Sequence, residues 1–534
     1  MKFKYIKSSL FIISFFLLTN SISSQVISNA DKAENKFTRV VQLIKLFYVD
    51  TVNDDKLIES AIVGMLKELD PHSVYMNKEE QKKANEPLLG NFEGIGVQFQ
   101  LVNDTIMVIS PTSGGPSEKL GIISGDRIVS VNGEDATGSK INNNWVVSKL
   151  RGEKGTKVKV GIRRKGVKEI LEFTITRDKI PINSIDASFI LVGDVGYIKL
   201  NRFSRTTMQE FNEAYDKLIV QGMKSLILDL RGNSGGFLDV SISLSEEFLP
   251  KDKLIVFTKG VASPREDYKS KKDGKFVKGK LVILIDEGSA SASEIVSGAI
   301  QDLDRGLIIG RRSFGKGLVQ RPFDLPDGSL IRLTTARYYT PTGRNIQKSY
   351  EGGVENYNKD LINRYNKGEL SNADSIHFPD SLKFFTEGKR VVYGGGGIMP
   401  DIFVPLDTSK ASNYYSELYR KGIFNQFTYD FVDKQREALK SKYKSFSDYK
   451  ESFVVDEKLL EDFYQYAANK GIKKDEAGIT LSKEYIILQI KAMIAKDIFD
   501  FSAYIQMYST IDEAILKAIE VLNDNTFDKM KIKH

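Results

Sequence analysis

The chain has 534 residues, of which 41% are apolar and 28% charged, the balance of an ordinary globular protein. At ~100–200 residues per domain, this length predicts two to four domains. A formal net charge of +7 is too small over this length to indicate nucleic acid or an anionic membrane as a partner. The absence of Cys excludes Cys nucleophiles, disulfides, thiolate zinc sites and iron–sulfur clusters, and three His leave few candidates for a His-dependent mechanism.

Residues 1–24 have the pattern of a secretory signal peptide. A basic start is followed by the apolar run Leu10–Leu18 and by small polar residues up to Ser24. The run is shorter than the ~20 residues that span a bilayer, so we expect cleavage near Ser23 or Ser24, with an uncleaved anchor as the alternative. The pattern predicts export to the periplasm or cell envelope, with membrane association left open.

Helical and β-like segments then alternate in blocks. Apolar residues at helical spacing over 35–69 predict an N-terminal helical region within 25–87. Residues 88–178 carry short β-like runs and one helical stretch, Trp145–Leu150, which predicts a small β-rich module.

Between residues 179 and 348, buried strands alternate with amphipathic helices. Strands are expected at 195–200, 225–230, 280–285, 307–309 and 329–335, and helices at 205–221, 237–248 and 291–303. This alternation predicts an α/β core with a mostly parallel sheet and flanking helices.

The remaining chain divides into three parts. Residues 349–393 are polar and are expected to be an irregular insertion, and residues 394–409 are expected to return to the core. Residues 410–534 have helical periodicity and mixed charges, so we expect a helical appendage that does not bind nucleic acid. Docking on the core, formation of homo-oligomers and recruitment of an adaptor are all open for it.

A Gly-rich turn follows the buried strand near residue 228. The segment Leu228–Gly236 can expose backbone N–H groups that hold an oxyanion. A tight turn that needs Gly for positive φ is the alternative, and it is favoured for this motif taken alone.

A second turn, within Leu284–Ile295, leads from a strand into a helix through small residues. A Ser at such a junction lies at a helix N-terminus, where developing negative charge is stabilised. Ser291 and Glu294 also fit a capping box, the more frequent use of such a Ser.

The segment Gly310–Gly317 nearly matches a phosphate-binding P-loop. Gly317 stands where the magnesium-binding hydroxyl is needed, and the next residues are expected to be extended, which argues against nucleotide binding. Lys316 could instead activate a Ser if burial lowered its pKa from ~10.4 toward ~7–8. A solvated loop charge is the alternative.

In their order and spacing, these motifs resemble those of the carboxyl-terminal processing (tail-specific) serine peptidases. The resemblance covers most of residues 40–348 and resumes at 396–401. Its matching segments are 69–73, 94–97, 121–128, 151–156, 228–236, 289–295, 314–317 and 336–341.

The resemblance implies a Ser–Lys hydrolase without metal or cofactor. The family spacing of 25 residues between Ser and Lys selects Ser291 as the nucleophile for Lys316. Ala292 and the Gly235–Gly236 turn are implied as the oxyanion hole, and Gln320 or Glu294 as the third catalytic residue. Four residues of straight strand span ~13 Å, so contact between Gln320 and Lys316 would need a kink near Gly317.

The resemblance also implies that residues 88–178 are a PDZ domain that binds the C-terminal tails of protein substrates. Its carboxylate loop would be Gly94, Ile95, Gly96 and Val97, with Trp145, Val147 and Leu150 lining the groove. Core packing is the alternative for Val147 and Leu150. A non-catalytic PDZ-containing binding or scaffold protein on the same fold is the competing function.

Overall fold

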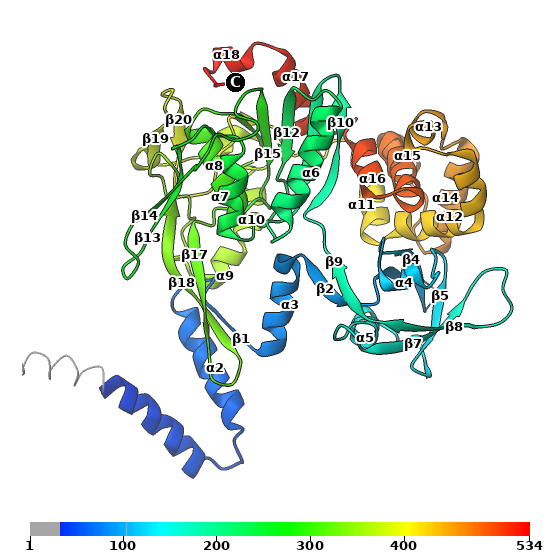
Figure 1. Ribbon diagram of the computed structural model, residues 1–534, viewed down its shortest axis with the longest axis horizontal. Helices are drawn as coiled ribbons and strands as arrows, with labels where there is room; N and C mark the ends of the chain where they lie inside the picture. The colour runs from blue at the N-terminus through cyan, green and yellow to red at the C-terminus, as the bar shows by residue number, and fades with distance from the viewer. Residues whose placement is uncertain (1–31, 103) are drawn as a thin grey trace, which may run out of the picture. The chain divides into compact units, whose positions relative to one another are not determined.

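The computed structural model describes residues 32–102 and 104–534, coloured along the chain in Figure 1. The predicted signal peptide lies outside the described residues. The chain divides into two compact units, residues 1–75 and 76–534. Within the described ranges, no helix combines the length and apolar character needed to cross a bilayer.

The first unit is helical where described, as the periodicity predicts. A helix over 32–47 precedes α2 (Asp54–Lys67), whose N-cap Asn53 accepts a hydrogen bond from Lys56 N–H. Asp70 then closes a turn by accepting from the backbone N–H groups of His72 and Ser73. Strand β1 (Val74–Met76) follows.

The second unit begins with α3 (Lys78–Leu89) and a β-rich module. Strands β2 (Asn91–Gly94) and β9 (Asp178–Pro181) pair antiparallel at its two ends. Between them lies an antiparallel sheet in the order β3-β4-β5-β7-β8, with β6 on β5. These strands are β3 (Val97–Val102), β4 (Thr105–Pro111), β5 (Arg127–Val131), β6 (Glu134–Asp135), β7 (Lys157–Arg163) and β8 (Leu171–Thr176). Helices α4 (Pro116–Lys119) and α5 (Asn143–Leu150) complete the module, as the sequence predicts for a PDZ domain.

The α/β core contains the predicted, mostly parallel sheet, in the order β10-β11-β12-β15-β16-β21. Only the β10–β11 pair is antiparallel among these neighbours. The strands are β10 (Ile185–Val192), β11 (Val195–Leu200), β12 (Ser225–Asp229), β15 (Leu281–Ile285), β16 (Leu307–Gly310) and β21 (Ile402–Phe403). Alternate residues of β12 enter two different hydrophobic clusters, so the sheet is buried on both faces.

Three helices pack against one face of this sheet (Figure 1). They are α6 (Thr207–Val220), α7 (Leu238–Glu246) and α8 (Ala292–Asp302), close to the predicted positions. Because α7 and α8 each follow a core strand, their N-termini lie at the ends of β12 and β15 that carry the Gly- and Ser-rich turns.

A second, antiparallel sheet was not expected from the sequence. It contains β13 (Leu254–Lys259), β14 (Glu266–Lys269), β17 (Leu318–Asp324) and β18 (Leu330–Tyr339). Strand β18 pairs with both β17 and β13, and β13 pairs with β14. The expectation of extended chain after Lys316 is confirmed, because β17 starts at Leu318.

The prediction that residues 349–393 are irregular is wrong. They form α9 (Gly353–Asn358), α10 (Asp360–Asn366), two 3-10 turns (Ala373–Ser375 and Asp380–Leu382) and the hairpin β19 (Lys383–Phe385) and β20 (Val391–Tyr393). The helices have six and seven residues and few apolar positions, too short to produce a detectable helical period.

The C-terminal part is helical, as predicted, but it forms two different packings. The first has its own core and comprises α11 (Asn413–Arg420), α12 (Ile423–Lys442), α13 (Phe446–Ser452), α14 (Glu457–Asn469) and α15 (Glu476–Ile498). The second comprises α16 (Phe501–Tyr508), α17 (Glu513–Asn523) and α18 (Thr526–Lys529), whose apolar residues pack against the other face of the main sheet. Residues 501–534 are therefore part of the core and not an appendage to it.

Candidate active site

Ser291 lies at the strand-to-helix junction between β15 and α8. It is the N-cap residue of α8 and has φ 55° and ψ −112°, a conformation that residues with a side chain seldom adopt. Such strain persists only where surrounding contacts impose it, and it is concentrated at functional sites. Nucleophiles of α/β hydrolases are exposed by strained strand-to-helix turns of this kind. The geometry therefore allows the capping and the nucleophilic roles of Ser291 together.

Glu294 holds this junction from the first turn of α8. Its side chain is fully buried and accepts from Ser291 N–H (2.8 Å), Lys316 N–H (2.9 Å) and Gly315 N–H (2.7 Å). Ser313 Oγ donates to the same carboxylate at 2.5 Å. Burial raises the pKa of Glu294, and these four neutral donors oppose the rise.

The same carboxylate joins the two residues that the sequence predicts to react. Ser291 and Lys316 are 25 positions apart, yet their N–H groups bind the same oxygen, Oε2 of Glu294. The hydroxyl of Tyr338, on β18, also donates to both carbonyl oxygens, at 3.2 Å to Ser291 and at a shorter distance to Lys316. Two buried groups thus fix the backbones of the candidate nucleophile and the candidate base together.

The segment that carries Lys316 is held on its other side by the insertion. Arg364, on α10, donates to the carbonyl oxygens of Arg312 (2.6 Å) and Ser313 (3.1 Å). Lys348 N–H donates to Gly315 O at 3.0 Å, and the Lys348 ammonium lies 3.9 Å from the centre of the Phe314 ring. Arg364 of the insertion and Lys348, the residue directly before the insertion, therefore support the segment before Lys316.

The Gly-rich turn after β12 approaches Ser291 directly. A Cβ on Gly235 would lie 2.9 Å from the Cβ of Ser291, and one on Gly236 would lie 2.0 Å from Phe203 O. Both positions therefore require glycine for close approach as well as for positive φ.

Within this turn the available donors differ from the expectation. The N–H of Gly235 donates to Asn233 Oδ1 (2.9 Å), so Gly235 is already engaged. Ala292 is the first helical residue of α8, and its N–H has no carbonyl one turn earlier in the helix to bind. This geometry leaves Gly236 and Ala292 as the better candidates for an oxyanion hole.

Gln320 lies on β17 beside an irregularity in the strand register. The pairing with β18 shifts between Val319 and Gln320, and Gln320 Nε2 donates to Thr334 Oγ1 at 3.3 Å. The kink expected near Gly317 thus falls two to three residues later. No geometry here identifies Gln320 as the third catalytic residue.

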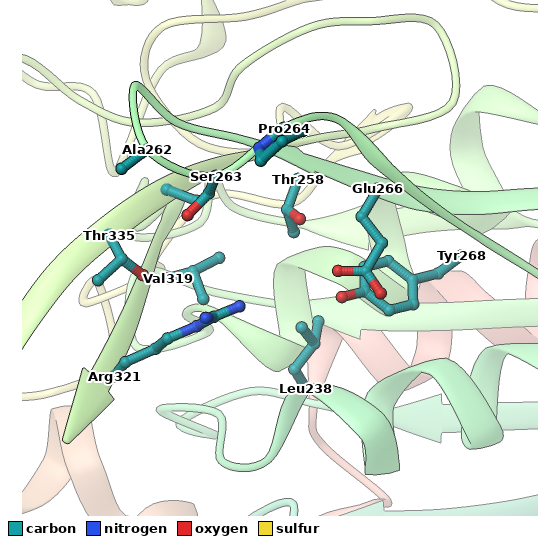
Figure 2. Close-up of a pocket in the computed structure, with 11 residues that line it drawn as sticks. Leu238, Thr258, Ala262, Ser263, Pro264, Glu266, Tyr268, Val319, Arg321 and Thr335 are labelled. Atoms are coloured by element: carbon teal, nitrogen blue, oxygen red, sulfur yellow. The ribbon is translucent and has the colours of Figure 1, made fainter. Parts of the chain in front are cut away.

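A cavity of about 260 Å³ is lined by residues of α7, β13, β14, β17 and β18 (Figure 2). Leu238 and Val319 contribute to its wall, two residues after Gly236 and three after Lys316. At ~3.3–3.6 Å per residue, both lie within about 11 Å of those positions. Figure 2 shows the guanidinium of Arg321 pointing into the cavity and the carboxylate of Glu266 beside the ring of Tyr268.

The β-rich module has a second open cavity, of about 290 Å³, between β3 and α5. Its lining includes five of the predicted groove residues: Ile95, Gly96 and Val97, and on α5 Val147 and Leu150. Phe92, Gln98, Phe99 and Arg151 also line it and were not predicted. The backbone of the carboxylate loop is fixed by hydrogen bonds from Thr112 N–H to Gly96 O and from Ser117 to Ile95 O.

Two predicted groove residues lie elsewhere. Trp145 packs against the hydrophobic core of the module, with the Lys149 ammonium 5.6 Å from its ring, and it is not among the lining residues. Gly94 ends β2, before the groove, and is also not among them. On α5, Trp145 and Val147 are two positions apart and so point to different sides of the helix.

Several residues of the reacting centre were not predicted as such. Tyr338, Asn233, Ser313 and Arg364 all contact the turns described above. Asn233 carries a local signal, since Asn side chains commonly bind the backbone two residues later. The others depend on contacts between distant segments.

Comparison with known proteins gives four family models along the chain. The model of peptidase family S41 matches residues 194–356, a PDZ domain model matches 94–175, and the model of the activating protease CtpB N-terminal domain matches 18–80. A family of unknown function matches 414–500.

Curated relatives match over much of their length. The carboxy-terminal processing protease CtpA of Bacillus subtilis is 36% identical over 368 residues, covering 68% of this chain and 77% of that protein. The carboxy-terminal-processing protease of Bartonella bacilliformis is 38% identical over 339 residues, covering 62% and 77%. Among solved structures, a photosystem II D1 C-terminal processing protease is 25% identical, covers 70% of this chain and 93% of its own, and has a TM-score of 0.36.

Proposed function

This chain belongs to the carboxy-terminal processing proteases of peptidase family S41, and from that premise we propose that it is an exported serine endopeptidase in which Lys316 activates Ser291. The observation that carries the proposal is the shared fixation of these two residues. Glu294 binds both N–H groups, and Tyr338 binds both carbonyl groups. The proposed export rests on the predicted signal in residues 1–24.

The proposed reaction begins with proton transfer. Neutral Lys316 takes the proton of Ser291 Oγ, and the oxygen attacks the carbonyl carbon of a peptide bond. The N–H groups of Gly236 and Ala292 stabilise the oxyanion, and loss of one such donor typically costs ~10²–10³ in rate. The protonated Lys316 then gives its proton to the leaving amine, and water resolves the acyl-enzyme.

In this scheme Glu294 is a positioning residue. Its oxygens accept from four donors, three of them backbone N–H groups of the reacting turns. Since those bonds hold both turns, we assign Glu294 to positioning, and Gln320 stays a candidate for the third catalytic residue on the family resemblance alone.

Substrate binding is proposed to use both cavities. The C-terminal tail of a protein substrate would add as a strand beside β3, with its last apolar side chain between Val147 and Leu150 and its carboxylate on the loop Ile95–Val97. A side chain next to the scissile bond would enter the cavity in Figure 2, where Leu238 and Val319 form an apolar wall.

The test compares the wild type with Ser291→Ala and Lys316→Ala on an unstructured protein that ends in apolar residues. We expect the wild type to cleave it, and each variant to lose at least ~10³-fold in kcat, because members of a catalytic unit fail together. Equal cleavage by all three proteins would refute the assignment of Ser291 and Lys316 as the catalytic residues. Tail binding without cleavage by the wild type would favour the scaffold alternative.

A further inference from the structure

An ion pair connects the C-terminal residues 501–534 to the start of the Gly-rich turn Gly232–Gly236. Asp512, the N-cap residue of α17, binds Arg231 NH1 with both carboxylate oxygens, each at 2.9 Å. Arg231 directly precedes the turn Gly232–Gly236, and the two partners are 281 positions apart.

Arg231 is the centre of a larger buried network. Its Nε and NH2 atoms bind Asp229, which is fully buried at the end of β12 (2.6–3.1 Å). Tyr197 Oη donates to Asp229 at 2.6 Å, and Lys199 Nζ donates to Arg231 O at 2.8 Å. Although burial opposes it, the charges of Asp229 and Asp512 raise the pKa of Arg231, so the guanidinium is charged in the folded protein.

The network continues into the reacting centre through the backbone. Asn233 N–H donates to Leu230 O, and Gly232 N–H donates to Asp286 Oδ1 (2.8 Å). Asn233 O in turn accepts from Ala290 N–H (3.0 Å) and Ser293 Oγ (2.8 Å), on either side of Ser291. Residues 229–233 therefore connect the Arg231 network to the turn that carries the nucleophile.

We propose that Asp512 is a positioning residue for the oxyanion hole. By holding the outer side of the Arg231 guanidinium while Asp229 holds the inner side, Asp512 fixes the start of the turn that carries Gly236. This inference rests on the proposed function of Gly236 as an oxyanion donor. It assigns to residues 501–534 an effect on the chemical step as well as their packing on the sheet.

The test is Asp512→Asn, because Asn also caps helices well and keeps the acceptor for Ala514 and Ile515 N–H. On a fluorogenic peptide with an apolar C-terminus, we expect kcat to fall about 10- to 100-fold with KM within twofold, since a small misplacement near the chemistry can cost ~10²-fold. Affinity for a peptide boronic acid, whose adduct places an oxygen in the hole, should fall by the same factor. Asp512→Glu should restore kcat to within about threefold of the wild type.

The matched control is Asp456→Asn, at the N-cap of α14, where the side chain accepts from Leu459 N–H. It should leave kcat and boronate affinity unchanged. If Asp512→Asn does not fold, Arg231→Lys takes its place, since a Lys cannot bind both carboxylates in fork geometry, and the same fall in kcat is expected.

The outcomes separate this inference from the proposed function. A wild type that does not cleave, or a Ser291→Ala variant that does, refutes the proposed function. A cleaving wild type whose folded Asp512→Asn or Arg231→Lys variant keeps kcat and boronate affinity within twofold overturns the role of Asp512. An equal loss in Asp512→Asn and Asp512→Glu also overturns it.

Discussion

The nucleophile turn and the Arg231 network each contain a buried carboxylate, and the two are stabilised in opposite ways. Glu294 accepts from neutral N–H and O–H donors, and burial raises its pKa. Asp229 is equally buried, but the charges of Arg231 and Lys199 overcome burial and hold its pKa well below the ordinary value.

We infer from this difference that Glu294 positions the reacting groups, whereas Asp229 stabilises the fold. The donors of Glu294 are the backbones of the two residues proposed to react, so a change there should move the reacting atoms. Asp229 is held mainly by the side chains of Arg231, Lys199 and Tyr197, with the backbone N–H of Arg231 as a further donor. A change there should chiefly reduce the free energy of unfolding, with a smaller effect on the reacting atoms through Arg231. The Glu294 and Asp229 predictions below test that division.

The largest effect is expected from Glu294→Gln. A Gln side chain offers one acceptor oxygen and turns an NH2 group toward N–H donors, which leaves at least one buried donor unsatisfied, at ~1–3 kcal/mol. We expect kcat to fall about 10²–10³-fold, measured on the apolar-tailed substrate. A Glu294→Gln variant with the wild-type kcat would show that this carboxylate does not position the reacting groups.

Asp229→Asn should act most strongly on stability, and it should also lower kcat, because Asp229 holds the same Arg231 guanidinium as Asp512. Removing one partner of a buried ion pair costs ~3–5 kcal/mol, which denaturant unfolding at pH 7 would measure. The matched control is Asp239→Asn, whose pair with Arg205 is exposed and worth at most ~1 kcal/mol. A loss as small as that of the control would contradict the proposed anchoring role of Asp229.

The same variant carries a pH signature. Because the folded pKa of Asp229 is lowered, its stabilisation is fully present above the unfolded value of ~3.9 and is lost as pH falls below it. The wild type should therefore lose more unfolding free energy between pH 5 and pH 2 than Asp229→Asn does. If the unfolding free energies of the two proteins fell in parallel with pH, the pKa of Asp229 would not be lowered in the folded state.

The smallest effect is expected in the PDZ groove. Val147→Asp places a negative charge in the apolar lining, where it should repel a tail carboxylate and raise KM about tenfold, or ~1.4 kcal/mol, with kcat unchanged. Ser148→Asp, on the exposed side of α5, is the control and should have little effect. If both variants raise KM equally, the groove does not bind the tail.

Local patterns predict much of the fold. Strand and helix periods locate β12, β15, α7 and α8, and the Gly- and Ser-rich turns follow from those positions. Short helices such as α9 and α10 could not be predicted, because one or two turns do not establish a period.

The shared contacts of the active site depend on tertiary packing. Tyr338 reaches Ser291 and Lys316 only because β18 pairs with β13 and β17, and Asp512 reaches Arg231 only because α17 packs on the sheet. Neither contact has a local signal. The engaged N–H of Gly235, in contrast, follows from an Asn two residues earlier and could have been expected.

Labelling with a fluorophosphonate, followed by intact-mass and peptide-mass analysis, tests the central claim most directly. The account predicts one phosphonyl group on Ser291 of the wild type, none at that site in Ser291→Ala, and labelling at least ~10²-fold slower in Lys316→Ala. A label on Ser289 or Ser293 instead, or wild-type labelling in Lys316→Ala, would contradict it.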